Sequence, residues 1–136
     1  MIFKYFTLKE FTNSETARKY YIHNSVPDDL LDNANYTLSR LDDIRERYGK
    51  PIYITSGYRC EKLNKLVGGK PSSQHLRAEA ADLKWDKELL SYIIQNCHFD
   101  QLIRESNGPT RWIHISFKKE NERNQILNLS NWNRLR

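Results

Sequence analysis

The sequence predicts an α+β fold in which helices pack on a small antiparallel sheet. Three observations support this class. Apolar residues that include Leu38, Leu41 and Ile44 recur at helical spacing early in the chain. Two runs that alternate between apolar and polar residues follow later, at 100–105 and 111–117, and a turn-rich segment joins them. Helices that precede paired strands are typical of α+β domains.

The helices are predicted from their caps and their apolar spacing. Thr7 and Glu10 have the spacing of a capping box, so a short helical turn is expected there. Ser25 is expected to cap the main core helix, which ends at Gly49. Asp86 is expected to cap a later helix. The expected helices cover residues 14–22, 25–49, 58–67 and 86–97.

Short strands are predicted between and after these helices. The turn at 106–109 joins the last two strands into an antiparallel hairpin. The pattern fades after Glu120, so 121–136 is expected to be a partly ordered tail, either a weak helix or a loose segment docked through Trp132. A single domain is therefore expected over 1–120. The expected strands cover residues 51–55, 80–84, 100–105 and 111–117.

Composition excludes several classes of protein. The 136 residues contain no apolar run near the ~20 that a membrane span needs, and no secretory signal is visible after Met1. Cys60 and Cys97 are too few for a disulfide scaffold and do not form a C-x-x-C pair. The net charge of +5 favours a polyanionic partner such as a bacterial cell wall. The basic residues are dispersed, so nucleic-acid binding is not expected.

Three residues with metal-ligand chemistry stand out. Strand alternation places Ile113 and Ile115 on the core face and His114 on the opposite face. Asp82 lies among apolar residues, where a buried carboxylate needs an ion pair, several hydrogen bonds or a metal. His75 lies in the polar loop just before it. Two imidazoles and one carboxylate are typical of a catalytic zinc site, while structural histidines and an ion pair are the alternative.

A family resemblance makes this pattern specific. Residues 73–82, SQHLRAEAAD, resemble the S-x-H-x-x-G-x-A-x-D signature of the zinc D-alanyl-D-alanine carboxypeptidase family, which also includes phage endolysins. The likeness extends over about residues 6–118 and implies a fold related to the hedgehog domain, with the zinc site in a cleft on the sheet. Further elements similar to the family are Ser56-Gly57-Tyr58-Arg59, Asn64 with Val67-Gly68-Gly69, Asp100-Gln101-Leu102-Ile103 and Trp112-Ile113-His114-Ile115-Ser116.

The resemblance implies a role for each matching residue. Arg59 matches the arginine that binds or polarises the substrate carbonyl or carboxylate. Ser73 and Gln74 are expected either to contact the substrate or to hold the loop. The implied Zn²⁺ ligands are His75, Asp82 and His114.

Two positions depart from the family pattern. Ala78 replaces the signature glycine, which costs about 1 kcal/mol if that position has a positive φ. Arg111 stands where many members have a catalytic carboxylate, three residues before the last histidine, and a guanidinium cannot act as a base. Glu105 is the expected base instead, with Asp100 as the alternative.

The expected position of Glu105 depends on the hairpin. Alternation places Glu105 on one strand face with Ile103 and Gln101. We therefore expect Glu105 to approach His114 only if the hairpin twists or bulges. In the hedgehog domain, too, a glutamate precedes the last histidine by more than three residues. That domain keeps zinc although its signalling does not depend on peptidase activity.

The predicted function is zinc-dependent hydrolysis of peptidoglycan stem peptides by a monomer. The bond is expected to be D-Ala-D-Ala, as in a carboxypeptidase, or L-Ala-D-Glu, as in an endopeptidase. The lack of a visible signal fits synthesis in the cytoplasm and delivery as a phage or prophage lysin, or on a virion. The alternative is a non-catalytic zinc-containing binding or structural module, which Ala78 and Arg111 favour. A third hypothesis is nucleic-acid binding through the basic tail after Glu120.

Overall fold

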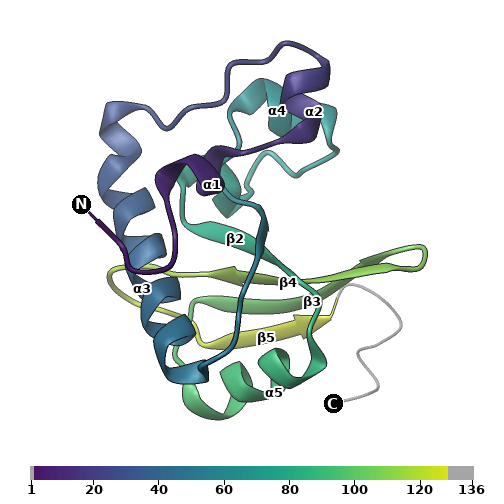
Figure 1. Cartoon of the computed structure of the whole chain (residues 1–136). Coiled ribbons are helices and arrows are strands. Elements are labelled where there is room, and N and C mark those ends of the chain that lie inside the picture. The colour runs from purple at the N-terminus through teal and green to yellow at the C-terminus, as the bar shows by residue number, and fades with distance from the viewer. Residues whose placement is uncertain (1, 129–136) are drawn as a thin grey trace.

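The structure is a computed structural model that describes residues 2–128 (Figure 1). A sheet forms the centre, α3 and α5 pack beside and below it in this view, and α1, α2 and α4 gather above it. This arrangement confirms the predicted α+β class. The helices are α1 (Leu8–Thr12), α2 (Glu15–Lys19), α3 (Leu31–Tyr48), α4 (Glu61–Leu66) and α5 (Lys87–Asn96), with 3-10 turns η1 (Asp28–Leu30) and η2 (Gln74–Arg77).

Two of the predicted helix starts are confirmed by their hydrogen bonds. Thr7 and Glu10 form the predicted capping box of α1, and Asp86 accepts from two backbone N–H groups at the start of α5. The prediction for Ser25 is wrong. Its hydroxyl lies 2.8 Å from His23 Nε2, and the chain enters α3 through η1 without a side-chain cap.

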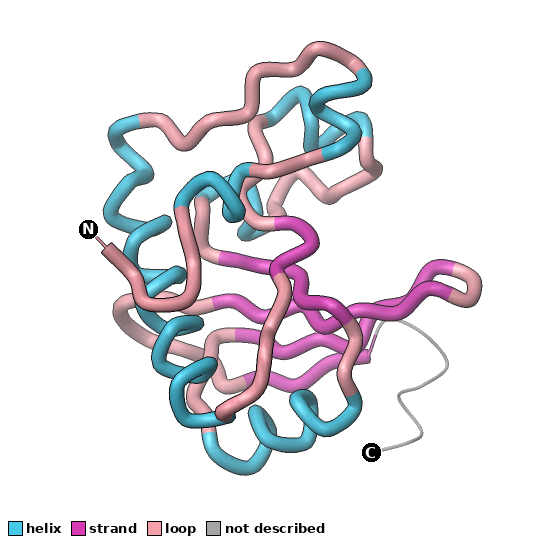
Figure 2. Tube along the Cα trace, in the orientation of Figure 1, coloured by secondary structure: helices cyan, strands magenta, loops and turns pink. Residues whose placement is uncertain are grey.

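The sheet has five strands in the order β1-β2-β4-β3-β5 (Figure 2). Neighbouring strands are antiparallel except β3 and β5, which are parallel, so the predicted purely antiparallel sheet is corrected to a mixed one. The strands are β1 (Ile54–Ser56), β2 (Ala80–Lys84), β3 (Gln101–Asn107), β4 (Thr110–Ser116) and β5 (Gln125–Asn128).

The parallel strand β5 lies in the segment expected to be a weak helix or a loose tail. Its four residues pair with β3 from Gln101↔Gln125 to Arg104↔Asn128. Part of the expected tail is therefore an edge strand of the sheet. The predicted docking of Trp132 falls outside the described residues.

The core lies between α3 and one face of the sheet. Leu38 and Leu41 of α3 are fully buried, as are Ile113 and Ile115 of β4, which confirms the predicted core face of that strand. Because successive strand residues point to opposite faces, β4 presents His114 on the other face. In the part of the chain that the structure describes, no helix is long and apolar enough to cross a membrane.

Candidate metal centre

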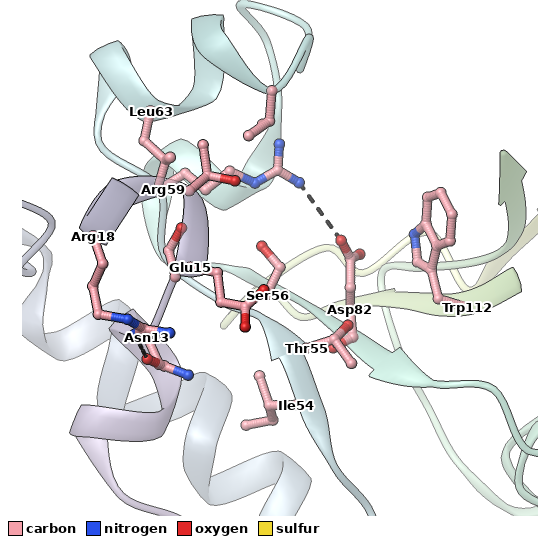
Figure 3. Close-up of a pocket in the computed structure, with 13 residues that line it drawn as sticks. Asn13, Glu15, Arg18, Ile54, Thr55, Ser56, Arg59, Leu63, Asp82 and Trp112 are labelled. Atoms are coloured by element: carbon pink, nitrogen blue, oxygen red, sulfur yellow. Dashed lines mark hydrogen bonds and ion pairs between the residues drawn. The ribbon is translucent and has the colours of Figure 1, made fainter. Parts of the chain in front are cut away.

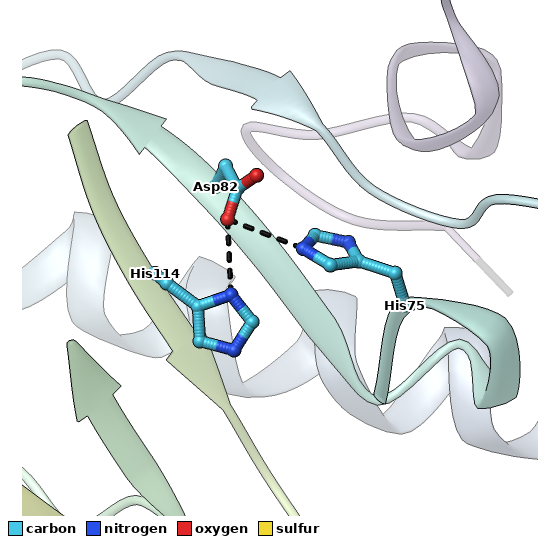
Figure 4. A group of neighbouring side chains, drawn as sticks. All are labelled: His75, Asp82 and His114. Atoms are coloured by element: carbon cyan, nitrogen blue, oxygen red, sulfur yellow. Dashed lines mark hydrogen bonds and ion pairs between the residues drawn. The ribbon is translucent and has the colours of Figure 1, made fainter. Parts of the chain in front are cut away.

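Strand pairing brings two of the predicted ligands together. Asp82 on β2 lies directly opposite His114 on β4, and His114 Nδ1 is 3.0 Å from Asp82 Oδ1. The third predicted ligand joins from η2, with His75 Nε2 3.2 Å from the same oxygen (Figure 4). The exposed fractions of these residues are 1% for His75, 7% for Asp82 and 8% for His114. One ligand atom from each lies within 4.8 Å of the others, as a shared metal ion requires.

The η2 turn fixes the orientation of His75. Ser73 caps this turn by accepting a hydrogen bond from the His75 backbone N–H at 3.2 Å. The ring Nδ1 lies 2.6 Å from the Gly57 carbonyl oxygen. A carbonyl can only accept, so Nδ1 carries a proton, and Nε2 is the ring nitrogen left to bind a metal. The donor set therefore fits Zn²⁺, with two imidazole nitrogens and one carboxylate oxygen.

Ala78 ends the η2 turn in the left-handed conformation, with φ of 59°. The position therefore has the backbone that favours glycine, and alanine costs about 1 kcal/mol there. Thr37 on α3 donates a buried 2.8 Å hydrogen bond to the Ala78 carbonyl oxygen. This bond ties the metal loop to the core and helps to offset the strain.

The electrostatics of the cluster keep Asp82 ionised. Burial raises the pKa of this carboxyl, but His75 and His114 outweigh burial and hold the pKa well below its usual range. Burial lowers the pKa of His114, and its hydrogen bond to Asp82 more than reverses that effect. The carboxylate thus remains negative and can offset part of the charge of a dication.

Glu105 reaches the cluster without a bulge. The β3–β4 register is regular, with Ile103 opposite His114 and Glu105 opposite Trp112. Directly paired residues share a face, so Glu105 and His114 project from the same side of the sheet. The condition that the hairpin must twist or bulge was wrong, because alternation from Ile103 already places Glu105 on that face.

The Glu105 carboxylate is held beside the cluster. Its Oε1 lies 3.8 Å from His114 Nδ1 and accepts a 2.7 Å hydrogen bond from Trp112 Nε1. This role of Trp112 was not predicted from the sequence, although the register set by the 106–109 turn could have revealed it. The Arg111 guanidinium instead lies over the Trp85 ring, 5.5 Å from its centroid. Glu105, the expected base, therefore lies beside the cluster.

Comparison with known protein families agrees with this geometry. A family model described as Peptidase M15 matches residues 4–116, which include the metal cluster and Glu105. The chain belongs to the peptidase M15 family. M15 peptidases depend on zinc, so the three converging ligands lie in a family that uses this metal. No curated protein matches the chain.

In this M15 peptidase, Arg59 contacts the second oxygen of a metal ligand. Its guanidinium Nη2 lies 3.6 Å from Asp82 Oδ2, and Nη1 donates to Asn64 Oδ1 at 3.0 Å. The Arg59 Nε is buried and makes no hydrogen bond within the described residues. Arg59 therefore lies where it can orient Asp82 and offer an N–H group to a bound molecule.

Gly69 leaves space for this arginine. A Cβ atom at position 69 would lie 2.1 Å from Asn64 Oδ1 and 2.7 Å from Arg59 Nη1. We expect Gly69→Ala to displace Arg59 and lower kcat/KM by about 10- to 100-fold, because misplaced binding groups lose their alignment with the substrate. Zinc affinity should stay close to that of the unchanged protein. Steady-state kinetics and a zinc titration test this, and unchanged kcat/KM would contradict it.

Asp100, the alternative base, binds Arg123 and Gln74 in this M15 peptidase. Its buried carboxylate accepts hydrogen bonds from Arg123 Nε and Nη2 at 3.0 and 2.6 Å, and from Gln74 Nε2 at 2.9 Å. Gln74 precedes His75, so the carboxylate links the metal loop to the segment before β5. This geometry favours Glu105 as the base and favours the loop-holding alternative for Ser73 and Gln74.

This network predicts an acid-sensitive contribution to stability. Burial raises the pKa of Asp100, but the hydrogen bonds from Arg123 and Gln74 outweigh burial and lower the pKa to about 2. An unfolded aspartate has a pKa of about 3.9, so the contribution is present above that pH and disappears as pH falls towards 2. We expect the melting temperature to fall more steeply between these values in the unchanged protein than in Asp100→Asn. Parallel melting curves for the two proteins would contradict this.

Two hollows open on the metal cluster. The first, the Trp112 hollow, holds about 570 Å³ and is lined by Asn13, Glu15, Arg18, Thr55, Leu63 and Trp112, together with Asp82 and Arg59 (Figure 3). The second, the Lys70 hollow, holds about 580 Å³ and is lined by Lys70, Ser72, Arg77, Gln101, Ile103 and Arg123, together with His75, His114, Glu105 and Arg59. The cluster of this M15 peptidase is therefore reached from both.

Proposed function

We propose that the protein hydrolyses peptide bonds in the stem peptides of bacterial peptidoglycan, with Zn²⁺ bound by His75, Asp82 and His114. The observation that carries the proposal is the position of Glu105, held by Trp112 at 3.8 Å from a metal ligand. A three-ligand cluster with a separate carboxylate beside it is the arrangement that metal-assisted hydrolysis needs.

Zinc bound there would polarise the substrate carbonyl and increase the acidity of a water molecule. Glu105 takes a proton from the attacking water and later delivers it to the leaving amine. Trp112 donates to one Glu105 oxygen and so fixes the direction of the carboxylate. Arg59 offers its guanidinium N–H groups to the oxyanion that develops on the carbonyl oxygen.

The surface charge supports a wall substrate. The net charge of +5 would concentrate the enzyme at an anionic cell wall. The proposal includes a role as a phage or prophage lysin, in which a monomer meets the wall after release or virion delivery. The stem peptide is the part of that wall with bonds a peptidase can hydrolyse.

Digestion of purified peptidoglycan tests this function. The zinc-loaded protein should release a terminal D-alanine or create new peptide ends that mass spectrometry identifies. A chelator should stop the reaction, and added zinc should restore it. If neither Gram-negative nor Gram-positive wall is cut while zinc is shown to be bound, the result would favour a non-catalytic module.

A further inference from the structure

We propose that the cleft binds an extended peptide on both sides of the metal cluster, so that the enzyme cleaves internal bonds, with the acidic part of the substrate in the Lys70 hollow. This inference rests on the proposed peptidase function and names the type of bond within it. The geometry of the two hollows, their unequal charge and the position of Glu105 support it.

Residues of the metal cluster line both hollows. His75 and His114 line the Lys70 hollow, and Asp82 lines the Trp112 hollow. Each hollow holds more than 500 Å³, which is the size of a small-molecule pocket. A peptide whose scissile carbonyl reaches the cluster therefore has room for residues before and after that bond.

Arg59 lines both hollows, and its guanidinium contacts Asp82 and Asn64. A carboxypeptidase needs room for one residue after the scissile bond, whereas the Lys70 hollow offers about 580 Å³. From its place beside Asp82, Arg59 can contact the carbonyl of a bond inside the chain.

The two hollows differ in charge. In the Trp112 hollow, Glu15 and Arg18 balance one another. The Lys70 hollow has three cations of its own, Lys70, Arg77 and Arg123, against the single carboxylate of Glu105.

These three cations are not equally available. The side chains of Arg77 and Arg123 pair with Glu79 and Asp100 and remain 50% and 48% exposed. The exposed Lys70 ammonium has no ion pair or hydrogen bond within the described residues. Lys70 is therefore the cation most available to a carboxylate of the substrate.

Glu105 gives the direction of the bound peptide. It lines the Lys70 hollow, so the amine that receives its proton leaves on that side. Water adds to the carbonyl carbon, the C–N bond breaks, and the amine departs with the proton from Glu105. The residues after the scissile bond, with their carboxylates, thus occupy the Lys70 hollow, and the residues before it occupy the Trp112 hollow.

The first test compares two stem peptides with the zinc-loaded full chain, beside a peptidoglycan digest. Both peptides are acetylated at the N-terminus and have acidic residues in the C-terminal half, and one ends in an amide. We expect the same internal bond to be cut in both, with kcat/KM values within about twofold of each other. Release of only the last residue, from the free acid alone, would overturn the inference and leave the peptidase function standing. No cleavage of peptidoglycan or of either peptide would overturn both.

A charge reversal tests the role of the Lys70 hollow. Lys70→Glu should raise KM for the acidic peptide about tenfold with little change in kcat, because the new carboxylate repels the substrate. A peptide with amides in place of its acidic side chains should be unaffected. Lys62→Glu, on the exposed surface of α4 and outside both hollows, is the matched control and should behave as the unchanged protein. Equal effects of the two substitutions would overturn the assignment of the acidic half.

Discussion

Glu105→Gln is expected to reduce kcat by about 10²- to 10⁴-fold while zinc remains bound. The amide cannot take a proton from water, but its oxygen can still accept the hydrogen bond from Trp112 Nε1, so the local structure should persist. Single-turnover cleavage of a stem peptide and the zinc content of the same sample measure both effects.

The matched control is Glu61→Gln, which removes a carboxylate from α4 outside both hollows. It should cleave at the rate of the unchanged protein. Full activity of Glu105→Gln would show that another group moves the proton. Loss of zinc from Glu105→Gln would show that this residue acts through the metal site instead.

Asp82→Asn is expected to weaken zinc binding by at least ~100-fold and to abolish cleavage. The substitution nearly preserves shape but removes the negative charge that lies between His75 and His114. Substitution of a residue that only hydrogen-bonds to a metal ligand costs about 10- to 100-fold in metal affinity. Asp82→Asn changes a ligand itself, so its effect should be at least as large.

Competition with a chromophoric chelator measures the zinc affinity of Asp82→Asn, and circular dichroism checks the fold of the metal-free variant. Asp100→Asn is a useful comparison, because it removes a buried carboxylate that contacts Gln74 and Arg123 but not the metal cluster. Stoichiometric zinc in Asp82→Asn at the affinity of the unchanged protein would contradict the ligand assignment.

The sequence predicted the metal cluster better than its surroundings. His75, Asp82 and His114 belong to matching motifs, and strand pairing between β2 and β4 assembles two of them in the way that alternation implies. The signature glycine that Ala78 replaces raised a positive φ as a condition, and the structure meets it. These features depend on local pattern and can be identified from a single chain.

Features that depend on long-range pairing were harder to predict. Strand β5 pairs in parallel with β3, and the short run at 125–128 has too little apolar alternation to indicate that partner. Ser25 has the residue type of a helix cap, but its hydroxyl bonds to His23, which residue type alone does not reveal. Glu105 lies beside His114 as predicted, and the regular register of the hairpin shows that the expected twist or bulge is not needed.

The most direct test of the zinc site is a crystal structure of the zinc-loaded protein with anomalous data at the zinc edge. We expect one strong peak in contact with His75 Nε2, Asp82 Oδ1 and His114 Nδ1, beside the Glu105 carboxylate. A zinc peak bound elsewhere on a protein that still cleaves stem peptides would contradict it.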